Sequence, residues 1–439
     1  MIPPGGTSLS IRPVTARDDL AEGLDLWHRG FGPPDGGIAD RRRAELTASL
    51  DGGRLLGAWE GSRWVGLALY EPMRQWWLGR ELPMAGVSGV AVAPESRGRG
   101  VGRALMRELL SAMVAAGYPL SALYPATARL YRSLGWEIAG RRYVAEIPAR
   151  SLTALLPPDP AGLDPAGPDA APSARSEGGP GAGPGLGAAA HGPSRRASIR
   201  RAVAADAKLV IAALGASYGA QRDCGPATGD RDFVGRLLDD PANFCYLAPD
   251  GFLAYAWGAD GDITVRILRA VTSATLRGLW SIVAGHAEIA GTVRAAIAPA
   301  DPISWLTGEP DVALSVRQHW MLRILDPAAA ISGRGFPPAA SLDVPLVLAD
   351  PEVPAAAGYH RLSIGAGQGT LFSLENESAR RSPATVRATR FGPRGLAAMY
   401  AGVPLATLRR AGLVSGGDPE TDASLDSAFG ATACLLELF

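Results

Sequence analysis

The alternation of apolar and polar positions predicts a strand, a loop and a helix in the N-terminal part of the chain. Residues 87–92 form a compact run of β-favouring residues, and apolar positions recur with helical spacing from residue 101 to about residue 117. A short strand at 121–125, a second short helix at 126–136 and a strand or hairpin at 135–148 are predicted next. This order is typical of a mixed α/β domain.

A similar order of elements is predicted in the middle of the chain. Residues 244–271 read as strands joined by Pro-Asp-Gly and Ala-Asp-Gly-Asp turns, and residues 274–288 read as an amphipathic helix. The segment SIRRAVAAD at 198–206 also repeats the pattern of SLSIRPVTARD at 8–18, a short strand followed by the polar start of a helix. We therefore expect a duplicated unit.

The C-terminal part follows another pattern. From about residue 321 the sequence predicts short strands at 342–350, 359–367 and 369–377, followed by one helix over 392–412, which indicates an α+β domain. The final residues, ATACLLELF, are apolar. Because chain ends are usually polar and frayed, we expect this end to be buried.

A linker is predicted between the first two regions. Of the 38 residues in 157–194, 27 are Pro, Gly or Ala, and the large aliphatic residues are Leu163 and Leu186. Such a segment cannot bury enough apolar surface to offset the entropy of ordering it.

Composition narrows the class of protein. At roughly 150 residues per domain, a chain of 439 residues suggests about three domains. The 43 basic and 43 acidic residues cancel, so no net positive field favours nucleic acid or an anionic membrane. Three cysteines without C-x-x-C spacing predict neither a disulfide framework nor a zinc site, and we expect no metal. With neither a signal sequence nor a membrane-spanning apolar run, a cytoplasmic location is expected.

The candidate chemistry lies in the loop from Arg97 to Gly102, which reads Arg-Gly-Arg-Gly-Val-Gly between the predicted strand and helix. Glycines let backbone amides approach an oxyanion closely, and a helix N-terminus adds unpaired donors and a positive dipole. A ligand-free glycine turn is the alternative. A Walker loop is excluded because no Gly-Lys-Ser/Thr follows, and a Rossmann fingerprint does not fit either. The loop therefore predicts a pyrophosphate cradle.

The spacing R-x-x-G-x-G at Arg97, Gly100 and Gly102 resembles the acetyl-coenzyme-A (acetyl-CoA) loop of the GNAT N-acetyltransferase superfamily. The resemblance implies acetyl-CoA as co-substrate, with backbone amides of the strand stabilising the oxyanion that forms when an amine attacks the thioester. The expected cofactor-binding residues lie on the strand, the loop and the start of the second helix: Val90, Ala91, Val92, Arg97, Gly98, Arg99, Gly100, Val101, Gly102, Arg103, Ala126 and Thr127.

In GNAT enzymes a tyrosine on the second short helix protonates the departing thiolate, and Tyr131 in LYRSLGW matches it. A tyrosine with a pKa of about 10 can donate this proton. The alternative is that Tyr131 only packs its ring. Tyr124 lies nearby, in the predicted strand.

Three features together resemble the enhanced-intracellular-survival (Eis) family of aminoglycoside acetyltransferases. They are the LYRSLGW segment, a second unit whose residues 267–280 lack closely spaced glycines, and a third domain that ends in phenylalanine. The resemblance implies two tandem GNAT domains, the second degenerate, followed by a sterol-carrier-protein-like α+β domain, in a homohexamer with one active site per chain. The expected division is a catalytic domain over 1–156, a linker over 157–197, the second GNAT domain over 198–320 and the C-terminal domain over 321–439.

The same resemblance implies that the α-carboxylate of Phe439 acts as general base. An unperturbed α-carboxylate has a pKa of about 3.5, so burial would have to raise it, or the group would orient the amine instead. Glu437 is separated from Phe439 by one residue, which leaves acidic contacts to a polyamine unassigned.

The acceptor is less defined by the sequence. The resemblance implies aminoglycoside-like polyamines, and the alternatives are lysine amines of peptides or proteins, or a CoA-binding sensor or scaffold without turnover. Asp25, Trp27, His28 and Phe31 border the region of the acceptor pocket in GNAT folds, and Trp76 with Trp77 could form a pocket wall or cap the core. These six residues are not assigned to catalysis.

Overall fold

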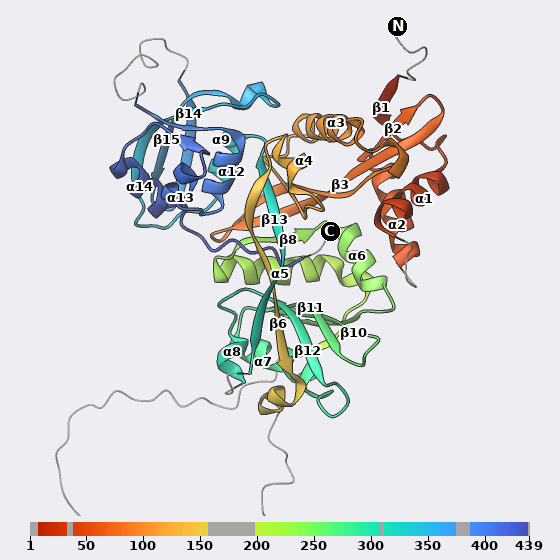
Figure 1. Cartoon of the computed structure of the whole chain (residues 1–439). Helices are drawn as coiled ribbons and strands as arrows, with labels where there is room; N and C mark the ends of the chain where they lie inside the picture. The colour runs from red at the N-terminus through yellow and green to blue at the C-terminus, as the bar shows by residue number, and fades with distance from the viewer. Residues whose placement is uncertain (1–7, 33–37, 157–197, 308–310, 375–386, 438–439) are drawn as a thin grey trace, which may run out of the picture.

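The computed structural model describes residues 8–32, 38–156, 198–307, 311–374 and 387–437. Its first part contains a strand-rich α/β unit (Figure 1). The elements in chain order are β1 (Leu9–Pro13), α1 (Leu20–Phe31), α2 (Ile38–Asp51), β2 (Leu55–Glu60), β3 (Arg63–Trp77), β4 (Arg80–Val92), α3 (Val101–Ala115), β5 (Leu120–Leu123), α4 (Ala128–Arg132) and β6 (Glu137–Pro148).

The second part has the strands and helix expected from the sequence, together with further short elements. Its elements are β7 (Arg200–Arg201), α5 (Ala207–Gln221), β8 (Cys224–Gly229), α6 (Arg231–Asp239), β9 (Phe244–Ala248), β10 (Gly251–Trp257), β11 (Ile263–Ala270), α7 (Ser273–Ala284), β12 (Thr292–Ile297), α8 (Ile303–Leu306) and β13 (Ala313–Ile324).

The third part packs helices on a five-stranded sheet. Its elements are α9 (Pro327–Gly333), β14 (Leu342–Leu348), β15 (Gly358–Gly365), β16 (Gln368–Ser373), β17 (Thr389–Phe391), α12 (Pro393–Tyr400), α13 (Leu405–Arg410), β18 (Val414–Ser415) and α14 (Pro419–Phe429).

The single helix predicted over 392–412 is wrong, because the structure has two helices there, α12 and α13. The break falls at Gly402, whose φ of 92° is the left-handed conformation that ends helices. Pro404 follows, and it lacks the amide that a continuing helix would need.

The first two parts share one sheet, in the order β1-β2-β3-β4-β5-β13-β6-β12-β11-β10-β9-β7, with β8 pairing separately with β3. Strand β13 from the second part inserts between β5 and β6, and β6 continues into the second part to pair with β12. These two strands cross between the upper and lower bodies in Figure 1. The predicted boundary at 320/321 falls inside β13, and the domain limits otherwise stay predictions.

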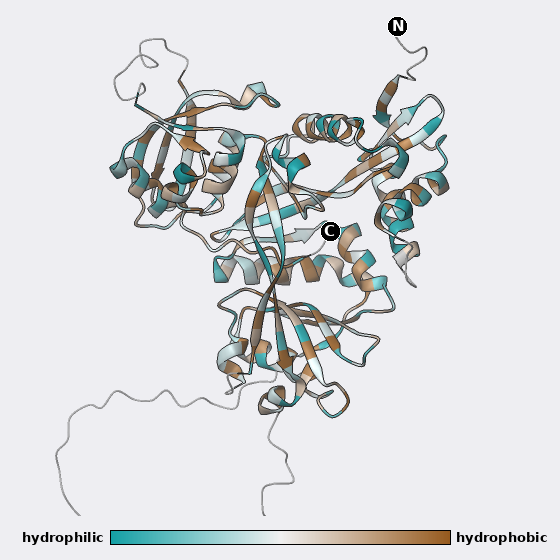
Figure 2. Ribbon diagram, viewed as in Figure 1, coloured by the Kyte–Doolittle hydropathy of each residue, from teal (hydrophilic) through white to brown (hydrophobic). Residues whose placement is uncertain are grey.

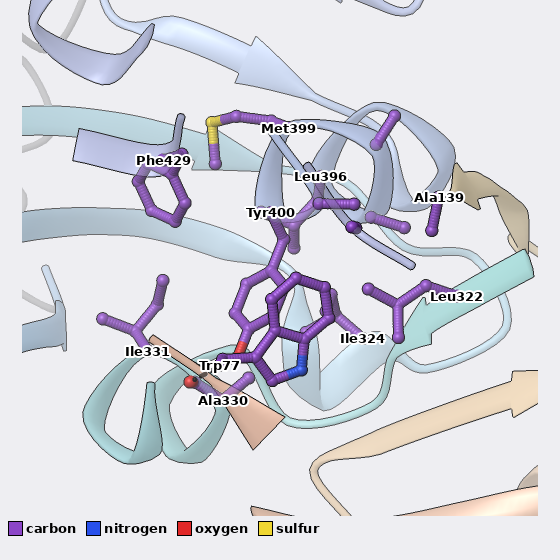
Figure 3. Close-up of a cluster of buried hydrophobic side chains, with 14 of the residues drawn as sticks. Trp77, Ala139, Leu322, Ile324, Ala330, Ile331, Leu396, Met399, Tyr400 and Phe429 are labelled. Atoms are coloured by element: carbon purple, nitrogen blue, oxygen red, sulfur yellow. Dashed lines mark hydrogen bonds between the residues drawn. The ribbon is translucent and has the colours of Figure 1, made fainter. Parts of the chain in front are cut away.

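Apolar residues line the strands, whereas α1 and α2 carry many hydrophilic residues (Figure 2). The end of β3 joins two cores. Trp77 is completely buried among third-part residues that include Tyr400 and Phe429 (Figure 3). Trp76, next to it, packs against Tyr218 of α5, with ring centroids 6.2 Å apart. Both tryptophans therefore join parts of the molecule.

Two further features concern the cysteines and the possibility of membrane-spanning helices. Cys224, Cys245 and Cys434 are free and buried. Within the ranges described above, no helix is both long and apolar enough to cross a membrane.

Candidate active site

Strands β4 and β5 separate at the point where the sequence predicts cofactor contacts. Their parallel pairing runs from Met84 opposite Leu120 to Gly86 opposite Ala122 and ends there, so β4 continues from Val87 without β5 beside it. The predicted residues Val90, Ala91 and Val92 lie on this unpaired stretch. Its backbone edge can therefore hydrogen bond to a ligand.

A β-bulge lies beside this separation. On β3, Leu67 pairs with Ala91 and Leu69 pairs with Ser88, which leaves Gly89 and Val90 opposite one residue. Gly89 has a φ of 59°, and a Cβ there would lie 3.1 Å from the Trp27 ring, so only glycine fits. The isolated glycine in the strand pattern was the available signal for this bulge.

The predicted phosphate loop has the backbone that its glycines allow. Gly98 and Gly100 have φ values of 75° and 87°, and Gly100 is the N-cap of α3. Among the described residues, the amides of Gly98, Arg99 and Gly100 have no hydrogen-bond acceptor. These amides and the N-terminus of the 15-residue helix α3 form a concentration of free donors suited to a pyrophosphate. The loop thus fits the phosphate part of acetyl-CoA.

The loop arginines are exposed and differ in their partners. Arg99 forms an ion pair with Glu60 at 2.9 Å, and Arg103 lies 3.8 Å from Glu352 of the third part. The Nε of Arg97 donates to the Val92 carbonyl at 3.3 Å, and its side chain has no ion pair with a described carboxylate. Arg97 is therefore the arginine whose charge is available to a phosphate.

Tyr131 lines a cavity of about 360 Å³ at the separation of β4 and β5, which we call the tyrosine cavity. Ala126 also lines it, and Thr127 is the exposed N-cap residue of α4. Burial raises the pKa of Tyr131 to about 12, and its hydroxyl has no hydrogen bond to a described residue. The wall of the cavity consists of Trp27, Phe31, Arg41, Arg42, Glu45, Val87, Ser88, Gly89, Val90, Tyr124, Ala126 and Tyr131.

Tyr124 is held by the C-terminal segment. It follows the end of β5 rather than lying in the strand as predicted, and its hydroxyl donates to the Glu437 carbonyl at 2.7 Å. Burial raises the pKa of Tyr124 well above its usual value. Because its hydroxyl is already engaged, Tyr124 is less suited than Tyr131 to give a proton to a leaving group.

The buried C-terminal segment agrees with the expectation from its apolar sequence. Leu435 and Leu436 are 0% and 3% exposed. The Glu437 carboxylate accepts hydrogen bonds from the Tyr218 hydroxyl and from the Ala227 amide, the latter at 2.9 Å. Burial raises the pKa of Glu437. Phe439 lies outside the described residues, so its expected role as base stays a prediction.

A second cavity, of about 300 Å³, lies between the first two parts and the C-terminal segment, and we call it the arginine cavity. It shares Arg41 and Glu45 with the tyrosine cavity. Its wall consists of Arg41, Glu45, Arg142, Phe233, Arg236, Leu237, Asp240, Asn243, Arg266, Ile267, Leu436 and Glu437. The two cavities are therefore adjacent and can hold the two ends of one acceptor.

Sequence reasoning missed the arginine cavity because its residues come from five separate regions of the chain. Arg142 is on β6, Asn243 precedes β9 and Arg266 is on β11. Glu45 belongs to α2, whose charged sequence reads as a solvated face, yet its carboxylate accepts a 2.6 Å hydrogen bond from Ser88. Burial raises the pKa of Glu45. No motif links these residues along the chain.

The residues considered for the acceptor side separate into two groups. Trp27 and Phe31 line the tyrosine cavity. Asp25 instead forms a 2.8 Å ion pair with Arg29 on the surface of α1, and His28 is absent from the walls of both cavities. An acidic contact from Asp25 to an amine is therefore not supported by this geometry.

The described residues of the second part form no comparable phosphate cradle. At the start of α7, Thr272 is the N-cap and its side chain accepts from the Thr275 amide. The Asp250 carboxylate accepts from the Thr272 amide at 3.0 Å and from the Thr275 hydroxyl. A carboxylate of the protein itself thus occupies the position that an anionic ligand would take. Among the residues that the structure describes, no cluster of three or more His, Cys, Asp or Glu could hold a metal ion.

Family comparisons divide the chain in the same way. An acetyltransferase (GNAT) domain matches residues 10–139, a second acetyltransferase (GNAT) domain matches residues 236–324, and a sterol carrier protein domain matches residues 327–436. The curated N-acetyltransferase Eis of Mycobacterium tuberculosis is 43% identical over 81 residues, which are 18% of this chain and 20% of that protein. The chain thus matches about a fifth of the length of these curated relatives.

Solved structures extend the likeness to nearly the full chain. A GCN5-related N-acetyltransferase from Kribbella flavida is 38% identical over 99% of both chains, with a TM-score of 0.83. Eis1 from Mycobacterium abscessus has the same fold at 20% identity, with a TM-score of 0.70 over 98% of this chain and 100% of its own. The chain therefore belongs to the GCN5-related N-acetyltransferases and has the Eis-like arrangement of two GNAT domains followed by a sterol carrier protein domain.

Proposed function

We propose that the protein transfers the acetyl group of acetyl-CoA to an amine of a small molecule bound in the two adjacent cavities. The main supporting observation is the tyrosine cavity, where the hydroxyl-bearing side chain of Tyr131 and the unpaired edge of β4 at Val90 line the same space. Acetyl-CoA supplies an activated acetyl thioester when bound.

The residues of the chain have distinct tasks in this proposal. The amides of Gly98, Arg99 and Gly100 bind phosphate oxygens, and the backbone of β4 at Val90 holds the acetyl carbonyl. Tyr131 keeps its proton through the physiological range, because burial raises its pKa to about 12. The Tyr131 hydroxyl can then donate that proton to the thiolate as it leaves.

The less defined element is the base that takes a proton from the acceptor's ammonium group, so that the neutral amine can attack the thioester. The α-carboxylate of Phe439 is our proposed base by resemblance to Eis. Leu436 and Glu437 line the arginine cavity, so the described segment leads to the site. An acceptor role for this carboxylate requires a pKa raised by burial.

Aminoglycoside-like polyamines are the acceptors that the Eis resemblance implies, and lysine peptides are the alternative. The tyrosine cavity has a volume of about 360 Å³ and the arginine cavity one of about 300 Å³. Together they suit a small molecule or a single extended side chain. A homohexamer and a cytoplasmic location also stay proposals from the resemblance.

The test is thiol release from acetyl-CoA by the untagged protein with neutral amines, polyamines, aminoglycosides, amino acids and lysine peptides, with mass spectrometry of the products. Acetylation of a small amine supports the proposal, and loss of turnover in Tyr131→Phe supports the site. Calorimetric binding of CoA without turnover on any acceptor would indicate a CoA-binding sensor and contradict an enzymatic role.

A further inference from the structure

The arginine cavity has an unusual charge for a site that would bind a polycation. Four arginines line it, against the carboxylates of Glu45, Asp240 and Glu437. Two of those carboxylates, Glu45 and Glu437, have pKa values raised by burial, which favours their neutral form. A polyamine would therefore meet a wall whose positive charges outnumber its negative ones.

Ion pairing compensates only some of the arginines. Arg41 lies 3.7 Å from Asp240, and Arg236 lies 3.2 Å from the buried Glu71. Arg142 and Arg266 form no ion pair with any carboxylate that the structure describes. Two partly buried guanidinium groups thus face the cavity without a counter-ion from the described chain, an arrangement that is costly unless an anion binds there.

Of these two arginines, Arg266 is the clearer example of a guanidinium group without a partner. Its Nε is buried and has no hydrogen-bond partner among the described residues. Burial lowers the pKa of Arg266, and repulsion from Arg41 lowers it further than Asp240 raises it. Among the charged neighbours of Arg266, Arg41 thus has the larger effect, and Asp240, the carboxylate that opposes it, already pairs with Arg41.

A second orphaned atom lies in the same wall. Asn243 is 5% exposed, and its Nδ2 donates to the Leu237 carbonyl at 2.9 Å. Its Oδ1 is buried and has no partner among the described residues. An unsatisfied donor on Arg266 and an unsatisfied acceptor on Asn243 together indicate a polar ligand, because buried polar groups are nearly always paired.

The rest of the wall indicates the shape of that ligand. Phe233, Ile267 and Leu436 add apolar surface to the same wall. The tyrosine cavity, where the amine would be acetylated, adjoins this cavity at Arg41 and Glu45. The acceptor should therefore have an amine at one end, an apolar or neutral middle and a negative group at the other end.

We infer that the acceptor is an amine that also carries an anionic group, a carboxylate or a phosphate, which Arg266 and Arg142 bind in the arginine cavity. This inference rests on the proposed acetyl transfer and narrows its acceptor class. Guanidinium groups bind both anions through paired N–H donors. This inference predicts that polycationic aminoglycosides are poor acceptors.

The experiment compares matched acceptors with the wild-type protein. The probes are ω-aminocarboxylates of increasing chain length, their primary amides, aminoalkyl phosphates and the corresponding amino alcohols, with an aminoglycoside as the polycation. We expect a KM for the best anionic amine that is roughly 10- to 100-fold below that of its neutral analogue, as hydrogen bonds to charged groups predict. Comparing the KM values of the ω-aminocarboxylates with those of the aminoalkyl phosphates shows which of the two anions the site prefers.

The main variant is Arg266→Gln, because Arg266 makes no hydrogen bond or ion pair to a described residue and its loss should leave the fold intact. It should raise KM for the anionic amine roughly 10- to 100-fold and leave KM for the neutral amide unchanged. Arg266→Glu should reverse the preference. Arg317→Gln is the control, because Arg317 is a half-exposed arginine paired with Glu146 at 3.0 Å and lies outside both cavities.

Three outcomes would overturn the inference. Equal KM values for anionic and neutral amines would remove the anion site, and a preference for the aminoglycoside would restore the polyamine class. An equal loss with every acceptor in Arg266→Gln would mean that Arg266 binds a carboxylate of the chain itself. If no acceptor is acetylated, the proposed function fails, and calorimetric binding of the anionic amines with CoA present still tests Arg266.

Discussion

The Tyr124 hydroxyl donates a hydrogen bond of 2.7 Å to the backbone carbonyl of Glu437. Tyr124 directly follows the strand that separates from β4, and Glu437 lies in the buried C-terminal segment. The same hydroxyl lies 3.2 Å from the Leu435 carbonyl. One side chain therefore connects the tyrosine cavity, whose wall it forms, to the segment that leads to Phe439.

Removing the Tyr124 hydroxyl should disturb the position of the C-terminal segment without weakening the binding of CoA. We expect Tyr124→Phe to lower the free energy of unfolding by about 1 kcal/mol, the usual net value of a buried hydrogen bond. Thermal or denaturant unfolding measures this change, and kcat should fall while the Kd for CoA stays unchanged. Tyr118→Phe is the matched control, because the Tyr118 ring packs edge-on to Tyr70 and its hydroxyl has no hydrogen bond among the described residues. Unchanged kcat in Tyr124→Phe would show that the tail is not needed for turnover.

The raised pKa of Tyr131 predicts the pH dependence of the reaction. A general acid must be protonated, and burial moves the Tyr131 pKa from 10.0 to about 12, so activity should not decline from its ionisation near pH 10. Tyr131→Phe should lower kcat by about 10²- to 10⁴-fold with little change in CoA affinity. A pH–rate profile and calorimetry test both points. A wild-type profile that falls at pH 10, with that fall absent from the variant, would contradict the raised pKa.

The sequence was most informative where chemistry depends on neighbours along the chain. The loop from Gly98 to Gly102 could be identified because a strand, glycines and a helix must follow one another to expose free amides. The GNAT superfamily could be predicted from that motif. The three-domain fold followed from the resemblance carried by the LYRSLGW segment, the glycine-poor second unit and the terminal phenylalanine. The order of elements also revealed the duplicated unit.

The parts that could not be predicted depend on distant segments meeting in space. Arg142, Asn243 and Arg266 have no local pattern that marks them as pocket residues, and their unpaired state depends on where carboxylates lie in the fold. The exchange of β6 and β13 between the first two parts was equally invisible, because each strand reads correctly by itself. The helix break at Gly402 was missed because the helical spacing of apolar residues over 392–412 was given more weight than the Gly-Val-Pro sequence, which favours the end of a helix.

Gly102 offers a test of the phosphate cradle that spares the fold. A Cβ there would lie 3.5 Å from Val92 and 3.7 Å from Leu130, which are ordinary contacts, and its φ is not positive. We therefore expect Gly102→Ala to keep its melting temperature but bind acetyl-CoA at least about 10-fold more weakly, because the methyl group crowds the approach of phosphate to the backbone. Gly235→Ala, in open space on α6, is the control. Unchanged acetyl-CoA affinity in Gly102→Ala would contradict the cradle.

Trp77 predicts a strong coupling between β3 and the third part. Its indole is completely buried and lies edge-on to Tyr400, with ring centroids 4.9 Å apart. Trp77→Ala should therefore cost about 3–5 kcal/mol of unfolding free energy through the cavity it leaves. Trp305→Ala, at a side chain that is 72% exposed, should cost little. Denaturant unfolding of both variants measures the difference, and equal stabilities would show that Trp77 does not join the cores.

Glu71 predicts how stability changes with pH. It is 1% exposed, and burial raises its pKa from 4.5 to about 7 despite the nearby Arg236. Between these two values the folded protein retains a proton that the unfolded chain has released, so stability falls as the pH rises.

The shift in the Glu71 pKa should contribute about 3 kcal/mol of this loss between pH 4.5 and pH 8, and Glu45 and Glu437, whose pKa values burial also raises, add to it. Glu71→Gln should flatten this decline and be more stable than the wild type at pH 8. Glu81→Gln, at a surface residue paired with Arg74 at 2.8 Å, should leave the slope unchanged. Urea unfolding at several pH values tests this. A wild-type stability that rises over the same range would mean that the attraction of Arg236 outweighs the burial of Glu71.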